Sequence, residues 1–350
     1  MSVKVQAVAK ALPAYYRSTD EIIPFLDTWL SGQEERFIKK VKKIFENAAV
    51  DKRYSIMTPE EVFSHTSFED KNNLYAREVI KLGKQCLLNA LDKAGIGTQD
   101  LDYIITVSCT GIMIPSLDAY LINELQLRQD IVRLPVTEMG CVAGISGMIY
   151  AYQFLQANPG KRAAVLAVES PTATFQLHDF SMANIVSAAI FGDGAACAIL
   201  SSHEADKGPA IMAAEMYHFY DATHLMGFQL TNAGLQMVLD VAVPEQIAAQ
   251  FPDIIHPFLA RHGSSMEAVK HLIFHPGGKK IIQTVEELFK NSGKNIDETK
   301  EILRMYGNMS SATVLYVLER FLDKQIPAGD QGLMLSFGPG FSAQRILLQW

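Results

Sequence analysis

Short, uninterrupted apolar runs recur along the chain. The clearest are Tyr103–Val107, Ala163–Val168 and Leu272–Phe274. A strand has a continuous apolar run when both faces of its sheet are covered, whereas a strand with one exposed face alternates between apolar and polar residues. The pattern therefore predicts a layered α/β protein whose sheets are covered by helices on both sides.

Three segments of this pattern occur twice, in the same order, in the two halves of the chain. Each first-half copy has the same succession of apolar, small and glycine positions as its second-half copy. The matched pairs are LDKAGIGTQDLDYIITVS (91–108) with LARHGSSMEAVKHLIFHP (259–276), GCVAGISGMIYAYQFL (140–155) with GNMSSATVLYVLERFL (307–322), and FGDGAACAIL (191–200) with FGPGFSAQRIL (337–347). One match could arise by chance, but three in order indicate two similar α/β halves packed on each other.

We place these halves at residues 1–203 and 204–350. The two copies of the third segment lie fewer residues apart in the chain than the two copies of the first or of the second. This difference predicts an insertion in the first half between its second and third segments. Residues 1–40 and 204–240 have no counterpart in the other half, and we expect them to be additions to the repeat.

Composition narrows the possible functions. The chain has 350 residues, 49% of them hydrophobic and 20% charged, and a net charge of −7, which fits a folded protein that is a poor partner for nucleic acid. No apolar run approaches the ~18–20 residues of a membrane span, and the N-terminus lacks the layout of a secretory signal. The four cysteines have no CxxC spacing, so we expect no metal site and a cytoplasmic, reduced protein.

Cys141 lies directly before a predicted helix and after the strand-like segment 131–136. The positive end of the helix macrodipole favours a thiolate at such a position, as a nucleophilic cysteine requires. A free cysteine here also fits a buried structural role. The repeat adds weight to the first interpretation, because the equivalent residue of the second half is Asn308, also at a helix start.

His275 follows the apolar strand that ends at Phe274 and precedes a glycine-containing loop. Functional side chains of α/β proteins are often found at such strand ends. Its imidazole could form an ion pair with Cys141 and donate a hydrogen bond to a thioester or enolate oxygen. Asn308 could supply a second donor, although its position also fits a helix N-cap.

The segments MGCVAG, FGDGAA, FHPGGKKI, YGNMSSAT and SFGPG resemble the signatures of the type III polyketide synthases, the chalcone synthase-like family, with some likeness to its bacterial members. The resemblance runs from about Ala7 to Trp350. It implies a duplicated thiolase-type fold, layered α-β-α-β-α, in which Cys141, His275 and Asn308 match the family's catalytic triad.

The chemistry that this resemblance implies begins with transfer of an acyl group from a starter CoA thioester to Cys141. Malonyl-CoA then loses CO2, and His275 and Asn308 stabilise the resulting enolate in a dry pocket. Repeated condensation and a final cyclisation or release complete the reaction. No carboxylate base is required, because decarboxylation itself generates the carbanion, and no cofactor is expected beyond the CoA thioester substrates.

Several cavity positions also follow from the resemblance. Phe191 matches a gatekeeper phenylalanine, and Thr174 matches the threonine of chalcone-forming members. Plant members usually carry threonine at the position of Cys109, whereas several bacterial members have a cysteine there, as this chain does. Cys109 also fits a buried structural cysteine. Phe228 falls where plant members have a small glycine, and Met237 where they have a second gatekeeper phenylalanine. A bulky Phe228 is expected to make part of the cavity smaller.

Two further positions bear on the cavity and on assembly. Ser310 matches a small cavity residue near Asn308. Ile114 matches a residue that extends into the cavity of a partner subunit, which implies a homodimer.

The basic stretch KKVKK (39–43), followed by the segment 51–53, is the candidate for binding the phosphates of CoA. Two of its lysines lie three residues apart and therefore on one face of a helix. The family places a third basic residue where this chain has Asn47, and the stretch also fits a solvated charged surface. The expected CoA contacts are Lys40, Lys43, Gly277 and Gly278.

Two other functions remain open at this level. One is a different condensing enzyme of the thiolase fold, such as ketoacyl-acyl carrier protein synthase III, which usually lacks HPGGKKI and SFGPG, or hydroxymethylglutaryl-CoA synthase, which uses a glutamate base. The other is a partner protein that binds acyl thioesters without catalysis. Such a partner would be expected to lack a member of the triad, and Cys141, His275 and Asn308 are all present.

Overall fold

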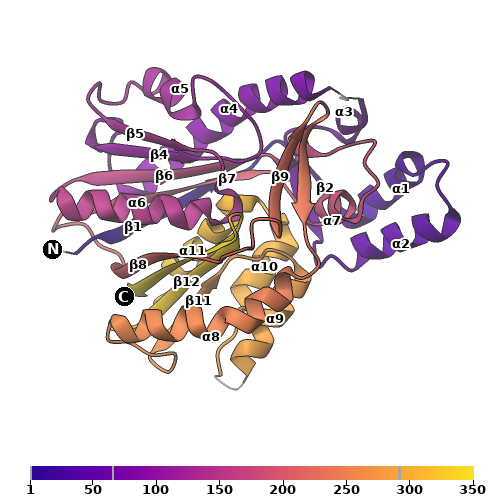
Figure 1. Ribbon diagram of the computed structural model, residues 1–350. Coiled ribbons are helices and arrows are strands. Elements are labelled where there is room, and N and C mark those ends of the chain that lie inside the picture. Colours follow the sequence, from indigo (N-terminus) through magenta and orange to yellow (C-terminus); the bar gives the residue numbers. More distant parts are fainter. Residues whose placement is uncertain (1, 65–66, 291–292) are drawn as a thin grey trace.

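A computed structural model describes residues 2–64, 67–290 and 293–350 (Figure 1). The strands are β1 (Lys4–Ala11), β2 (Tyr15–Ser18), β3 (Lys52–Ser55), β4 (Tyr103–Val107), β5 (Val132–Val136), β6 (Arg162–Glu169), β7 (Gly194–Ser201), β8 (Ala210–His218), β9 (Met226–Thr231), β10 (Gly234–Leu239), β11 (Val269–Phe274), β12 (Gln331–Gly338) and β13 (Ser342–Gln349). The α-helices are α1 (Thr19–Trp29), α2 (Glu35–Glu46), α3 (Pro59–Ser64), α4 (Phe68–Ala94), α5 (Leu117–Glu124), α6 (Ala143–Ala157), α7 (Met182–Ile190), α8 (Val243–Arg261), α9 (Lys279–Phe289), α10 (Asp297–Tyr306) and α11 (Thr313–Leu322). The short 3₁₀ turns are η1 (Thr98–Asp100), η2 (Gly140–Val142), η3 (Pro171–Thr174) and η5 (Ser310–Ala312). Within the described residues, no helix has the length and apolar character to cross a membrane.

The main sheet has the strand order β11-β12-β13-β8-β1-β7-β6-β4-β5. In its first half, β4 runs parallel to β6, and β7 pairs antiparallel with both β6 and β1. In its second half, β11 runs parallel to β12, and β13 pairs antiparallel with both β12 and β8. The two half-sheets meet through one residue pair, Lys4 with Ala210. The repeated strand order confirms the duplication predicted from the sequence.

The sequence analysis was wrong to treat residues 1–40 and 204–240 entirely as additions to the repeat. β1 and β8 lie within those segments and occupy equivalent places, each beside the last strand of its half-sheet. Their sequences differ enough to hide the match. The predicted insertion is confirmed, because η3 and α7 separate β6 from β7, whereas a short turn joins β12 to β13.

Helices cover both outer faces of the two half-sheets and fill the space between them (Figure 1). α6 and α11 lie in the middle, where Ile145, Met148, Leu315 and Tyr316 share one core with residues of both half-sheets. α4 and α5 cover the outer face of the first half, and α8 and α9 that of the second. This arrangement is the layered α-β-α-β-α fold that the sequence predicted.

The starts of the two central helices touch each other. Gly140 and Gly307 both have positive φ, 58° and 71°, a conformation that residues with a side chain rarely adopt. A Cβ added to Gly144 would lie 2.2 Å from the backbone oxygen of Ser311. Glycine at position 144 therefore lets the two helix starts approach closely.

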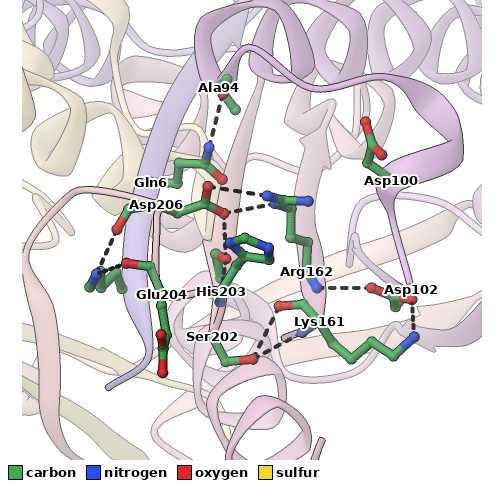
Figure 2. A network of polar contacts seen from close by, with 12 residues as sticks. Gln6, Ala94, Asp100, Asp102, Lys161, Arg162, Ser202, His203, Glu204 and Asp206 are labelled. Carbon is green, nitrogen blue, oxygen red and sulfur yellow. Dashed lines mark hydrogen bonds and ion pairs between the residues drawn. The ribbon is translucent and has the colours of Figure 1, made fainter. Parts of the chain in front are cut away.

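The amino ends of β4 and β6 are held by ion pairs (Figure 2). Asp102 accepts from Lys161 Nζ at 2.8 Å and from the Arg162 backbone at 3.0 Å. The Arg162 guanidinium donates two hydrogen bonds, of 2.7 and 3.1 Å, to Asp206 in the connection between β7 and β8. These contacts fix the strands at one end of the sheet, and the candidate catalytic residues lie at the other.

Candidate active site

A cavity lies at the carboxyl ends of the central strands and is lined by residues of both halves. Most of the cavity residues predicted from the sequence line it. They are Cys109, Cys141, Phe191, Phe228, Met237, His275, Gly277, Asn308 and Ser310. We call this space the catalytic cavity.

Cys141 lies in the turn η2, directly before α6. The hydroxyl of Ser336, at the end of β12 in the other half, donates to the Cys141 backbone oxygen at 3.0 Å. The thiol contacts the Ser310 hydroxyl, with Sγ and Oγ 3.7 Å apart. The first half thus supplies the nucleophile, and the second half holds it in place.

Burial raises the pKa of the Cys141 thiol to about 12, while the hydrogen bond from Ser310 acts in the opposite direction and the Glu169 carboxylate adds to the rise. The helix start had predicted a shift toward thiolate. The residue is half-buried and lines the cavity, with most of its surface covered by protein. Because a charged sulfur loses its hydration there, the empty site favours the neutral thiol.

His275 follows β11 and is 2% exposed. Neither ring nitrogen has a hydrogen-bond partner among the described residues, so the structure lacks the ion pair with Cys141 suggested by the sequence. Burial lowers the pKa of the imidazole to about 3. A neutral imidazole with both nitrogens unpartnered is available to exchange a proton with, or donate a hydrogen bond to, a bound substrate.

The Asn308 side chain has a fixed orientation. Its Oδ1 accepts from the backbone N–H of Ser310 at 2.9 Å and from the Thr313 hydroxyl at 3.4 Å. Its Nδ2 donates to the Gly277 oxygen at 3.2 Å. Because an amide nitrogen carries two hydrogens, one donor remains for a substrate oxygen in the cavity.

Phe191 is coupled to Asn308 through the backbone. The Asn308 N–H donates to the Ile190 oxygen at 2.7 Å, and the Gly192 N–H donates to the Asn308 oxygen at 3.1 Å. Across the cavity, Phe228 and Met237 are paired residues of the hairpin formed by β9 and β10. These three apolar side chains lie along the wall of the cavity, as the sequence predicted.

Glu169 is a buried site residue that the sequence reasoning missed. It ends β6, is 0% exposed, and accepts hydrogen bonds from the Cys109 backbone at 3.0 Å and the Thr110 hydroxyl at 2.8 Å. Ser311 of the second half also donates to it. Burial raises its pKa, while these hydrogen bonds oppose the rise. A carboxylate directly after a fully apolar strand was the signal that could have identified it.

Cys109 joins this group to the catalytic cavity. Its Sγ lies 3.3 Å from the Ser310 hydroxyl and 3.7 Å from Glu169 Oε2. Burial and the neighbouring carboxylate together raise its pKa well above that of a free thiol. Ser310 therefore lies within reach of both thiols of the site.

Other predicted residues lie outside the catalytic cavity. Thr174 lines a neighbouring chamber and donates to the Pro171 oxygen at 2.8 Å. Gly278 directly precedes α9 and is not among the cavity-lining residues. Ile114 is 92% exposed on the surface.

Lys40 and Lys43 are exposed on α2 and line one groove, as their spacing predicted. Among the described residues, neither ammonium group forms an ion pair. The nearby segment 51–53 does not extend this basic surface as the sequence suggested, because Asp51 pairs with Arg304 and Arg53 is buried. Lys39 and Lys42 of the same stretch pair with Glu35 and Asp27, which leaves Lys40 and Lys43 as the lysines of α2 available for phosphate binding.

Comparison with known proteins places these features in a family. The model of the chalcone and stilbene synthase N-terminal domain matches residues 2–204, and that of the C-terminal domain matches residues 211–350. The chain is 33% identical to a 1,3,6,8-tetrahydroxynaphthalene synthase of Streptomyces peucetius subsp. caesius, over 99% of this chain and 93% of that protein. It is 29% identical to a phloroglucinol synthase of Pseudomonas fluorescens, over 88% of each. The solved structure of the tetrahydroxynaphthalene synthase of Streptomyces coelicolor A3(2), a bacterial type III polyketide synthase, superposes with a TM-score of 0.93 at 26% identity and covers 99% of both chains.

Proposed function

The chain belongs to the chalcone and stilbene synthase family of type III polyketide synthases, and we propose that Cys141 carries the growing acyl chain while His275 and Asn308 direct decarboxylative condensation with malonyl-CoA. The observation that carries the proposal is the convergence of these three side chains, from both halves, on one enclosed cavity. Both nitrogens of His275 are unpartnered there, so they are available to a substrate.

The first step is transfer of the starter acyl group. His275 accepts the Cys141 proton as the sulfur attacks the thioester carbonyl, and the proton then goes to the departing CoA thiolate. The high pKa of the thiol and the low pKa of the imidazole both favour the neutral pair before substrate binds. Proton transfer is therefore expected during the reaction rather than in the empty site.

The second step is loss of CO2 from malonyl-CoA. The electron pair of the broken carbon–carbon bond moves into the thioester carbonyl and gives an enolate, whose oxygen the Asn308 amide and His275 stabilise by hydrogen bonding. The enolate carbon attacks the acyl carbonyl on Cys141, and the sulfur leaves. The extended chain is then a CoA thioester that can return to Cys141 for another round.

The substrates and the assembly are parts of the same proposal. The Lys40 and Lys43 ammonium groups are positioned to attract the phosphates of CoA, and the backbone at Gly277 lines the catalytic cavity. CoA thioesters are then the substrates, and no cofactor is required. The exposed Ile114 side chain supports a homodimer, and the four free cysteines support a reducing, cytoplasmic location.

The test uses purified protein with malonyl-CoA and a panel of starter CoA thioesters, and identifies products by mass spectrometry. Intact-protein mass measurements report acyl transfer to the enzyme. We expect an extended product with at least one starter and an acylated enzyme that is lost in Cys141→Ala. Cys197→Ala removes a buried thiol of β7 outside the cavity and is the matched control, expected to keep both signals. Absence of CO2 release and of product with every starter would contradict the proposal.

A further inference from the structure

A second cavity adjoins the catalytic cavity. The two share Pro171, Phe191 and Met237 as lining residues, so these side chains lie between them. The second cavity extends between η3, α7 and the N-terminal segment from β2 to α3. We call it the N-terminal chamber.

Nine of the 24 residues that line the chamber are aromatic. Phe25 of α1 stacks on Phe63 of α3 with ring centroids 6.1 Å apart, and the Trp29 ring meets Phe175 edge-on at 5.0 Å. Such a wall suits an apolar or aromatic chain, which would lose little by leaving water. The chamber therefore has a surface suited to the part of an acyl chain that extends beyond the gatekeepers.

Two lining residues, Arg17 and Arg53, are cationic and do not fit an entirely apolar occupant, and Arg53 is the buried one. Arg53 is only 7% exposed, and its Nε and Nη1 have no hydrogen-bond acceptor. Among the described residues, no carboxylate forms an ion pair with it. Burial lowers its pKa to about 10, so the guanidinium still carries its charge at neutral pH. A buried cation without a counter-ion is costly unless another group completes it.

A purely structural role accounts for only part of this side chain. Nη2 donates to the Ala189 oxygen at 2.9 Å, in the last turn of α7, and to the Thr19 hydroxyl at 3.2 Å. A cation is favourable at a helix C-terminus. These contacts use one nitrogen, whereas Nε and Nη1 are buried without an acceptor among the described residues, and the guanidinium carbon lies 5.8 Å from the centre of the Phe45 ring.

We infer that the N-terminal chamber binds the distal end of an acyl starter that carries a terminal carboxylate, with Arg53 as its counter-ion. The inference rests on the proposed function for the acyl chain itself. A carboxylate oxygen is the acceptor that a guanidinium pairs with most strongly, and the aromatic wall accommodates the methylene chain leading to it. The substrate class is then an α,ω-dicarboxylic acyl thioester.

The catalytic cavity has a different lining from the N-terminal chamber. The starter carboxylate bound in the chamber is therefore not the carboxylate that malonyl-CoA loses as CO2. Among the described residues, no lysine or arginine lines the catalytic cavity. A fixed cation there would stabilise the malonyl carboxylate in the ground state and oppose its loss as CO2. The carboxylate in the chamber is therefore held for recognition and is not consumed.

The test compares octanedioyl-CoA with octanoyl-CoA, which differ in the terminal carboxylate, as starters for the wild-type enzyme, Arg53→Met and Arg53→Lys. We expect the wild type to prefer octanedioyl-CoA by at least about tenfold in kcat/KM, mainly through KM, because Arg53 binds a remote part of the substrate. Arg53→Met should lose this preference while its kcat/KM with octanoyl-CoA stays within about threefold, and Arg53→Lys should restore part of it. A wild type without preference, or an Arg53→Met variant that loses both activities equally, would overturn the inference.

Direct binding keeps the inference testable if Arg53→Met does not fold. Trp29 lines the chamber, and the chain's other tryptophan is Trp350, so Trp350→Phe leaves Trp29 as the single indole reporter. We expect octanedioate to change Trp29 fluorescence at concentrations at which octanoate does not, and equal responses to the two acids would contradict the inference. If octanoyl-CoA is extended without any preference for the dicarboxylate, the inference fails and the proposed function stands. If octanedioate binds through Arg53 but no starter is extended, the chamber stands as an anion site and the synthase function fails.

Discussion

The starts of α6 and α11 are equivalent points of the two halves, and they differ in chemistry. Each has a glycine with positive φ followed by a polar or reactive residue, which lies within the turn η2 in the first half and before the turn η5 in the second. In the first half that residue is Cys141, and in the second it is Asn308. The duplication thus brings two equivalent positions to one cavity, where one half supplies the nucleophile and the other a hydrogen-bond donor.

The two side chains are held very differently. Asn308 has its amide oxygen fixed by two donors and one amide hydrogen engaged with Gly277. The Cys141 sulfur has only the long contact with Ser310, although its backbone is anchored by Ser336 of the other half. An oxyanion donor gains from being preorganised, whereas a sulfur that forms and breaks bonds with acyl groups must stay free to approach them.

Replacing Asn308 is expected to have the largest effect, because it removes the hydrogen-bond donor and leaves the nucleophile Cys141 in place. Asn308→Ala removes the oriented amide donor, so decarboxylation of malonyl-CoA should fall by about 10²–10³-fold, as for loss of one oxyanion donor elsewhere. Acylation of Cys141 by a starter CoA should stay within a few-fold, because the sulfur is untouched. Release of CO2 and the intact mass of the acylated enzyme measure the two steps separately.

The opposite pattern would contradict the assignment. If Asn308→Ala keeps full decarboxylation, Asn308 does not serve the enolate. If acylation and decarboxylation fall together, the residue holds the fold of the site through its hydrogen bonds to Ser310 and Thr313 and is not a specific donor.

A second prediction concerns the contact between the two helix starts. Gly144→Ala places a Cβ 2.2 Å from the Ser311 backbone oxygen, which cannot move without displacing the turn that follows Asn308. We expect a loss of about 1–3 kcal/mol in the free energy of unfolding, even though alanine favours a helix over glycine. Chemical denaturation followed by circular dichroism measures this change.

Gly83→Ala in α4 is the matched control for the helical substitution. Its Cβ would meet the end of the Leu117 side chain at 3.2 Å, which can adjust more easily than backbone. We expect its free energy of unfolding to change by no more than about 0.5 kcal/mol. Equal losses in the two variants would show that the approach of the helix starts is not specially close.

Much of this arrangement could be predicted because it depends on local sequence. The repeated segments indicated the duplication, and the glycine before each reactive residue marked where Cys141 and Asn308 lie. The equivalence of β1 and β8 could not be predicted, because apolar side chains of different kinds pack equally well in a covered strand. Sequence separation also hid the chamber around Arg53, since its walls come from segments that only the fold brings together.

The electrostatic state of the site was the least predictable part. A helix start and a nearby histidine both favour a thiolate, and these features are visible in the sequence. Burial opposes them, and the extent of burial depends on all the elements around Cys141. Glu169 shows the same limit, because three donors from two halves satisfy it and none of them is close to it in the sequence.

Replacing Ser310 is expected to have the smallest effect, and it isolates the sulfur itself. The hydroxyl lowers the pKa of Cys141 against the larger effect of burial, so Ser310→Ala should raise that pKa further and slow alkylation by about two- to fivefold at a given pH. The substitution is not expected to change the backbone, because serine and alanine are equally strained at the φ of 48° found at position 310.

A thiol whose pKa is raised to about 12 is protonated at neutral pH. The rate of iodoacetamide labelling should therefore rise about tenfold per pH unit from pH 7 to 9 in both proteins, with the variant lower throughout. Labelling of Cys141→Ala gives the contribution of the other thiols. A rate that is already level below pH 8 would show that a thiolate is held in the empty site, and the helix start would then outweigh burial.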